Sequence, residues 1–146
     1  MPDAPSLPNF TGIWKLNLEK STIRGALPKQ ILMNIEHRDP TVIQQILSTD
    51  QNGAQQRQIF TCRIGAETKN SVGGIELQSG SQWNGQELVI ESRMNARGRE
   101  FYFKDHWSIS KDGRTLTMAH RDDDLAGQIS ILEKMPDADS EKFADF

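Results

Sequence analysis

The chain has 146 residues, one cysteine and a formal net charge of −3. This length predicts a single domain large enough to bury its own core, and one cysteine excludes an intramolecular disulfide framework. No apolar run is long enough to cross a bilayer as a helix, so no transmembrane segment is expected.

The negative charge is concentrated at the C-terminal end. Residues 136–146 carry Asp137, Asp139, Glu141 and Asp145 against Lys142, which leaves the rest of the chain formally neutral. A neutral body has no field that gathers phosphates, so nucleic acid is not an expected partner. We expect residues 136–146 to be an acidic, solvated tail with no packing role.

The N-terminal residues 1–9, MPDAPSLPN, are rich in proline and polar residues and predict a flexible segment. They lack the apolar core of a secretory signal. Two origins remain open: a cytoplasmic protein, or an exported or periplasmic protein whose signal peptide has been removed.

From residue 10 onward the hydrophobic period is two, which is typical of half-buried strands. The opening stretch FTGIWKLN (10–17) places Phe10, Gly12 and Trp14 on alternate positions. Later alternating runs predict strands at 31–38, 42–49, 57–64, 87–94, 100–110, 114–120 and 127–134, with a further one near 74–83. No stretch has a long helical period.

Short turn clusters separate these runs. They read RDP (38–40), DQNG (50–53), WNG (83–85), NARG (95–98), KDG (111–113) and DDDLAG (122–127). Asn-Gly and Asp-Gly supply the positive φ angles of tight hairpins, so consecutive strands are expected to pair. About nine such strands, within a range of eight to ten, predict an all-β, up-and-down antiparallel β-barrel over residues 10–135, because closure removes the exposed edges.

The segment FTGIWKLN resembles the first strand of the calycin superfamily, which includes the lipocalins and fatty-acid-binding proteins. The resemblance implies that Trp14 closes the bottom of a barrel and that Gly12 allows a close backbone approach. RIGAE (63–67), SQWNGQELVIES (81–92) and WSISKDGRTLTM (107–118) are similar, in order and spacing, to middle and late strands of fatty-acid-binding proteins.

A stronger resemblance is to uncharacterised bacterial lipocalin-like proteins, many of them exported. Their Pro-Asn-Phe-x-Gly-x-Trp, Asn-x-x-Lys-Ser and Trp-x-Gly-x-x-Leu-x-Ile patterns match Pro8 to Trp14, Asn17 to Ser21 and Trp83 to Ile90. The resemblance covers most of residues 8–134 and implies a fold more than a function.

Two features depart from the fatty-acid-binding pattern. The connection LEKSTIRGALPKQ (18–30) contains Gly25 and Pro28 and has room for one helical turn at most, whereas those proteins insert a helical lid there. The last strand reads ISI (129–131) where those proteins carry an Arg-x-Tyr pair that grips a carboxylate. The resemblance therefore does not imply a carboxylate clamp in this chain.

Strand parity predicts which side chains line the barrel. The faces that carry the aliphatic residues also carry His37, Ser92, Asp105 and His120, with Gln44 or Gln45 depending on register. We take as candidate ligand-binding residues His37, Gln45, Phe60, Ser92, Phe103, Asp105 and Met118.

Asp105 stands out because its face is otherwise Phe101, Phe103, Trp107 and Ile109. An ionised carboxylate there needs hydrogen-bond donors. Three interpretations remain open: a bulge or a structural water that satisfies Asp105, a ligand that Asp105 orients together with His37 or a glutamine, and an acid–base pair with a histidine.

Other polar clusters have simpler explanations. HRDDD (120–124) could suit a hard cation but falls in a hairpin connection, and the histidines lack zinc-site spacing, so no metal and no cofactor are expected. Cys62 is expected to be a buried, inert thiol, and Trp83 and Trp107 to pack in the core. Arg97 and Arg99 form either a solvated hairpin tip or a frame around the barrel mouth that attracts an anionic head group.

The sequence therefore predicts a lipocalin-like barrel that holds a small, hydrophobic or amphipathic molecule in its interior. Two alternatives remain: a barrel with a solid core that serves structure or interaction, and a cavity isomerase or hydratase that uses Asp105 and a histidine. The enzyme requires Asp105 and His37 to meet in one pocket. The sequence discloses neither the ligand nor the oligomeric state.

Overall fold

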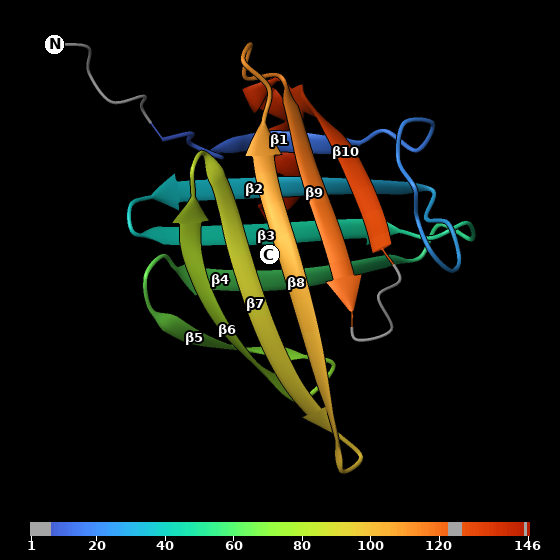
Figure 1. Ribbon diagram of the computed structural model, residues 1–146. Coiled ribbons are helices and arrows are strands. Elements are labelled where there is room, and N and C mark those ends of the chain that lie inside the picture. Colours follow the sequence, from blue (N-terminus) through green and yellow to red (C-terminus); the bar gives the residue numbers. More distant parts are fainter. Residues whose placement is uncertain (1–6, 123–126, 145) are drawn as a thin grey trace, which may run out of the picture.

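The computed structural model describes residues 7–122, 127–144 and 146. Ten strands and one short 3-10 helix make up its regular structure (Figure 1). They are β1 (Gly12–Leu16), β2 (Gln30–Arg38), β3 (Thr41–Thr49), β4 (Gln55–Arg63), β5 (Glu67–Val72), β6 (Ile75–Asn84), β7 (Glu87–Ala96), β8 (Arg99–Ile109), β9 (Thr115–Asp122), β10 (Gly127–Met135) and η1 (Asp137–Phe143). None of the helices in the described part of the chain has the length and apolar character needed to cross a membrane.

All ten strands belong to one antiparallel sheet with the order β4-β3-β2-β1-β10-β9-β8-β7-β6-β5. Strands that follow one another in sequence pair with each other, except β4 and β5, and the first and last strands, β1 and β10, also pair. Figure 1 shows β1–β4 running across behind β6–β9, as expected for a sheet that curls back on itself. The predicted up-and-down all-β barrel is confirmed.

The barrel is nearly closed, with β4 and β5 as its two edges. No backbone ladder joins these strands over the described residues. The Asn70 side chain spans the seam instead: it accepts a hydrogen bond from the Thr61 N–H and donates one to the Thr61 carbonyl, both at 2.8 Å. A side-chain amide thus substitutes for one pair of ladder bonds.

Strand β5 was not among the expected strands. Its sequence, ETKNSV, contains Val72 as its one apolar residue, so it has no alternation to detect. Pairing with β6 from Glu67 to Val72 creates the strand.

Two apolar clusters lie on opposite faces of the sheet. The inner cluster fills the barrel and includes Phe10, Trp14, Trp107, Leu116 and Leu132. The outer one lies on β1, β2 and β3, where Ile13, Leu32 and Leu47 are covered by Phe143 of η1.

The expectation that the tail has no packing role is wrong. Phe143 is 5% exposed, because its ring covers apolar side chains that the barrel leaves on its outer face. Without the ring of Phe143, an apolar patch made of Ile13, Leu32 and Leu47 would face the solvent. The segment η1 is therefore acidic in its first turn but attached to the barrel through Phe143, its one buried residue.

The inner face of β10 is not the face that carries its isoleucines. Ile129 is 45% exposed. The register pairs Leu132 with Leu116 and Ser130 with Met118, so Gln128, Ser130 and Leu132 face inward. Ile129 and Ile131 share the outer face while Leu132 lies on the inner one, so the apolar residues of this strand do not mark its inner face.

Residues 9–14 explain the opening stretch of the sequence. Phe10 and Trp14 are fully buried, and the Trp14 indole N–H donates to the Phe10 carbonyl at 3.0 Å. Gly12 has a φ of 153°, and a Cβ there would lie 3.1 Å from Lys134 Cε and 3.3 Å from Trp14 Nε1. Side chains, rather than the expected second backbone, therefore crowd Gly12.

Residues 1–6 of the predicted flexible segment lie outside the described residues. Asn9 is anchored, since its side-chain amide donates to the His37 carbonyl at 3.2 Å. The segment 17–29 between β1 and β2 contains no helix, so the predicted absence of a helical lid is confirmed.

Candidate functional site

The barrel is packed solid at one end. Phe10 lies face to face with His37 and Trp83 and edge-on to Trp107, with ring centroids 5.5–5.9 Å apart. Trp14, Leu88 and Leu116 complete this floor and are fully buried. Trp107 therefore packs in the core, as predicted, and no room remains there for a ligand.

His37 belongs to the floor. Its Nδ1 accepts the Phe10 N–H at 3.2 Å, which leaves Nε2 as the donor to the Asp39 carboxylate at 2.5 Å. The ring is 3% exposed and both its nitrogens are engaged. His37 was predicted as a ligand-binding residue, but its geometry is that of a structural residue that fastens residues 9–11 to β2.

The other end of the barrel is open to solvent. Inward-facing side chains in that half are partly exposed although they sit within strands, and on β4 the inward-facing Gln56 and Gln58 are exposed. The partly exposed set comprises Ile31, Ile46, Phe60, Met94, Phe101, Phe103, Asp105 and His120. Water therefore reaches the inward-facing side chains at this end of the barrel, in contrast to those of the floor.

A carboxylate–imidazole pair lies within this open half. Asp105 on β8 and His120 on β9 are directly opposite each other in the sheet, and His120 Nδ1 lies 2.7 Å from Asp105 Oδ1. Phe103 stacks on the imidazole with centroids 5.5 Å apart. The side chains are 25% and 36% exposed, so both groups face the lumen without being sealed from water.

The electrostatics of this pair favour a charged imidazole. The hydrogen bond to Asp105 raises the pKa of His120 above its usual 6.5, and the Asp122 carboxylate adds to the rise. Partial burial and the nearby Arg24 guanidinium act in the opposite direction. Arg24, from the β1–β2 connection, forms an ion pair with Asp122 at 3.0 Å, so that connection is tied to the barrel mouth.

Hydroxyl groups lie on the strands next to the carboxylate–imidazole pair in the sheet. Ser79 on β6 and Ser92 on β7 are buried, and their Oγ atoms lie 2.7 Å apart. Thr68 on β5 pairs with Ser79, and its buried Oγ1 has no hydrogen-bond partner. Ser92 is paired with Phe103 on β8, so small polar side chains lie directly beside large apolar ones on the inner face of the sheet.

The structure places most of the predicted lining residues inside the barrel. Phe60, Ser92, Phe103, Asp105 and Met118 all face inward by register. Gln45 does not: it pairs with Asn34 and accepts a hydrogen bond from the Asn34 amide at 2.9 Å on the outer face. Gln44 is the inward residue, buried and 3.2 Å from Met33 Sδ, because the register pairs it with Ile35 and Phe60.

Sequence reasoning placed His120 on the right face but left it out of the predicted set, and it did not find Arg24 or Asp122. The signal for His120 was present, since Leu116, Met118 and His120 alternate on one strand. No pattern in the sequence predicts the contact between Arg24 and Asp122, because Arg24 lies in the irregular connection between β1 and β2, whose course no periodicity describes.

The meeting of Asp105 and His37 that the enzyme alternative required is absent, and Asp105 has a different histidine as its partner. Asp105 pairs with His120 in the open half, and His37 lies in the floor with Asp39 as its partner. Asp105 and His37 therefore do not meet in one pocket. The Cys62 thiol is buried, and burial raises its pKa, which keeps it protonated and unreactive.

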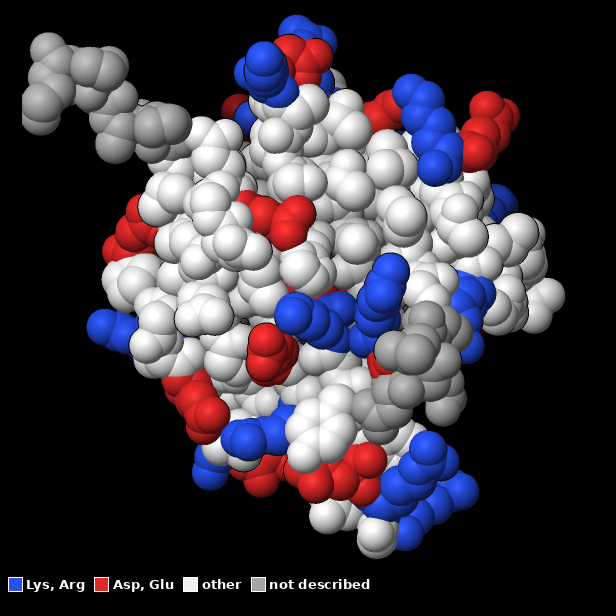
Figure 2. Space-filling view, in the orientation of Figure 1, with Lys and Arg blue, Asp and Glu red and all other residues white. Residues whose placement is uncertain are grey.

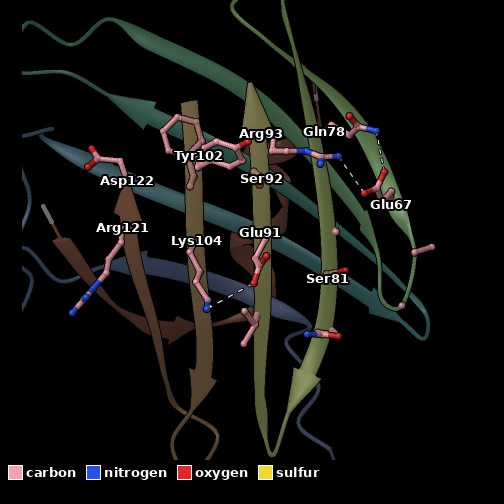
Figure 3. A pocket seen from close by; sticks show the side chains of 16 residues that line it. Glu67, Gln78, Ser81, Glu91, Ser92, Arg93, Tyr102, Lys104, Arg121 and Asp122 are labelled. Carbon is pink, nitrogen blue, oxygen red and sulfur yellow. Dashed lines mark hydrogen bonds and ion pairs between the residues drawn. The ribbon is translucent and has the colours of Figure 1, made fainter. Parts of the chain in front are cut away.

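The outer surface carries a hollow of about 960 Å³, lined mostly by outward-facing residues but reaching Ser92 and Phe103. It lies over β6–β9, where Figure 2 shows acidic and basic side chains interleaved. Figure 3 shows Glu91 paired with Lys104, at 3.7 Å, and Glu67 in contact with Arg93 and Gln78. These charges neutralise one another, so the hollow is an ordinary solvated face.

Within the described ranges, no group of three or more histidine, cysteine or acidic side chains could hold a metal ion. Of the cluster HRDDD, Asp123 and Asp124 lie outside the described residues, as does most of the turn DDDLAG.

Comparison with known proteins identifies the fold. No protein-family model matches the chain, and no curated protein matches it significantly in sequence. Among solved structures, a Schistosoma mansoni fatty-acid-binding protein in complex with arachidonic acid superposes with a TM-score of 0.64 at 12% identity, covering 90% of this chain and 100% of that one.

Two further structures are similar. The fluorescent protein UnaG matches with a TM-score of 0.60 at 17% identity over 86% of this chain and 97% of its own. The zebrafish ileal bile-acid-binding protein complexed with cholic acid matches with a TM-score of 0.58 at 14% identity over 86% and 98%. These likenesses, together with the ten-stranded antiparallel order, show that the chain has a calycin fold of the fatty-acid-binding-protein type.

Proposed function

We propose that this protein binds one small, largely apolar or amphipathic molecule in the open half of its barrel. The observation that carries the proposal is the difference between the two ends: the floor is solid, whereas inward-facing Ile31, Phe60 and Phe103 remain partly exposed. Apolar groups left accessible to water inside a concave surface gain free energy when a ligand covers them.

Structural likeness supports the same function. Two proteins of this fold have structures with arachidonic acid and with cholic acid, both amphipathic molecules. The lumen here has the matching chemistry, since apolar rings share it with Asp105, His120 and the Ser79–Ser92 pair. The ordered motifs from Pro8 to Ile90 further support kinship with bacterial lipocalin-like proteins as part of this proposal.

Adjacent positions on β10 provide a matched test of lumen binding. Ser130 faces the lumen opposite Met118, while its neighbour Ile129 points outward. The substitution Ser130→Trp places an indole inside the barrel, and Ile129→Trp places the same group outside.

The measurement is fluorescence titration with Nile red, an uncharged, environment-sensitive dye. We expect saturable binding to the wild type and to Ile129→Trp, and a loss of at least about tenfold in affinity for Ser130→Trp. Circular dichroism and thermal melts establish that each variant is folded. Absence of saturable binding to the wild type, or equal binding by all three proteins, would contradict the proposal and favour the solid barrel.

A further inference from the structure

We propose that the molecule held in the lumen carries a hydrogen-bond-donating polar group, such as an amine or an alcohol, and that this group binds at Asp105 and His120. The inference rests on the proposed function and specifies which class of ligand the lumen selects. A fatty carboxylate is the class that it disfavours.

Asp105 and His120 each use one polar atom to contact the other, and each has a second polar atom left over. One carboxylate oxygen, Oδ1, contacts His120 Nδ1 at 2.7 Å. Among the described residues, neither Asp105 Oδ2 nor His120 Nε2 has a hydrogen-bond partner. The pair therefore offers an acceptor and a ring nitrogen to whatever occupies the lumen.

The surroundings of Asp105 strengthen the requirement for a donor. Across the sheet it faces Ile90, and along β8 its inward neighbours are Phe103 and Trp107. A carboxylate oxygen among apolar side chains loses solvation that a hydrogen-bond donor restores. A ligand amine or hydroxyl at this point supplies that donor, and an amine also supplies the opposite charge.

The inward-facing strand positions of the lumen offer little to a carboxylate. Among the described residues, the inward-facing Lys and Arg side chains stand at the two extremes: Arg99 at the start of β8, over the Phe101 ring, and Lys134 beside Trp14. Arg99 is six residues from Asp105, or about 20 Å along an extended strand. Arg24 is already paired with Asp122.

At a pH above the pKa of His120, where the imidazole is neutral, a ligand carboxylate at the Asp105–His120 pair lies beside one carboxylate and near a second, Asp122, whose charge also acts on His120. Like charges at such separations in a partly buried site cost binding free energy. The geometry favours a donor for this reason as well.

The test is competition for bound Nile red in the full chain, using dodecylamine, dodecanol and dodecanoate, which share one chain length. At about pH 8 the amine is protonated and the acid ionised. We expect dodecylamine and dodecanol to displace the dye at concentrations at least about tenfold lower than dodecanoate. Displacement by dodecanoate at equal or lower concentration would overturn the inference.

The variant Asp105→Asn keeps the shape of the side chain and removes its charge. We expect the affinity for dodecylamine, measured relative to the variant's own affinity for Nile red, to fall about tenfold from the wild-type ratio, because the protonated amine loses the carboxylate that pairs with it. Glu91→Gln is the matched control, because Glu91 faces outward and pairs with Lys104. Unchanged competition by dodecylamine in folded Asp105→Asn would also overturn the inference.

The two proposals fail in different ways. If Nile red does not bind, the lumen is not a binding site and both fall. If Nile red binds and dodecanoate competes best, lumen binding stands and the head-group inference alone is wrong. Should Asp105→Asn not fold, the wild-type competition series decides by itself.

Discussion

His120 is the residue whose chemistry depends most on its neighbours. The hydrogen bond that the His120 ring donates to Asp105 raises the pKa of His120 above 6.5; the Asp122 charge raises it further, and the Arg24 charge lowers it. A raised pKa in the folded state means that the pair stabilises the fold fully below about pH 6.5, and that this contribution is lost as pH rises through the folded pKa.

We predict that the NMR titration of the His120 ring gives a pKa above 6.5 in the wild type and a lower one in Asp105→Asn. The stability difference between the two proteins should shrink as pH rises, because deprotonated His120 loses its charge attraction to Asp105. Glu91→Gln, on the outer face, should leave the titration unchanged. An identical pKa in wild type and Asp105→Asn would show that Asp105 is not the cause of the shift.

The alternation of residues along the strands predicted some inward-facing side chains and not others. Parity placed Phe60, Ser92, Phe103, Asp105 and Met118 on the inner face correctly, because each stands two residues from another residue of the apolar face of its strand. Gln44 and Gln45 are adjacent and chemically identical, so nothing in the sequence separates them. The register of the β3–β4 pair determines which of the two faces inward, because it places Gln44 opposite Phe60.

At the scale of elements, a segment is predictable when it carries its own hydrophobic pattern. β2 and β8 do so, and their positions were expected. β5 does not, since its partner β6 and the Asn70 bridge to Thr61 hold it in place. The helix η1 is acidic and short, and the ring of Phe143 docks on apolar residues from three strands, which no local pattern encodes.

The docking of η1 gives a stability prediction. Phe143→Ala removes a buried ring and uncovers Ile13, Leu32 and Leu47, so we expect a loss of about 2–4 kcal/mol in the free energy of unfolding. Urea denaturation measures this loss. Lys142→Ala, at an exposed neighbour, should change the value by less than about 0.5 kcal/mol. Equal effects of the two substitutions would mean that η1 adds no packing energy.

At the scale of the whole molecule, the barrel combines a rigid floor with a softer mouth. The floor joins strands from both ends of the chain, since β1 pairs with β2 and β10, and the aromatic rings of Phe10, Trp83 and Trp107 meet inside it. The open half has the β4–β5 seam and exposed glutamines on β4. Stability is therefore concentrated away from the proposed binding region, which leaves the mouth able to open for a ligand.

This division predicts a pattern of amide hydrogen exchange. Leu116 and Leu132, paired across β9 and β10 in the floor, should exchange slowest, and residues 55–59 should exchange fastest among the strands. Saturation with Nile red should slow exchange around Phe60, Phe103 and His120 while leaving the floor unchanged, because the ligand orders the half that it enters. The same dye added to Ser130→Trp should slow exchange nowhere, whereas slowing confined to the outer hollow at Glu91 and Lys104 would place the ligand outside the barrel.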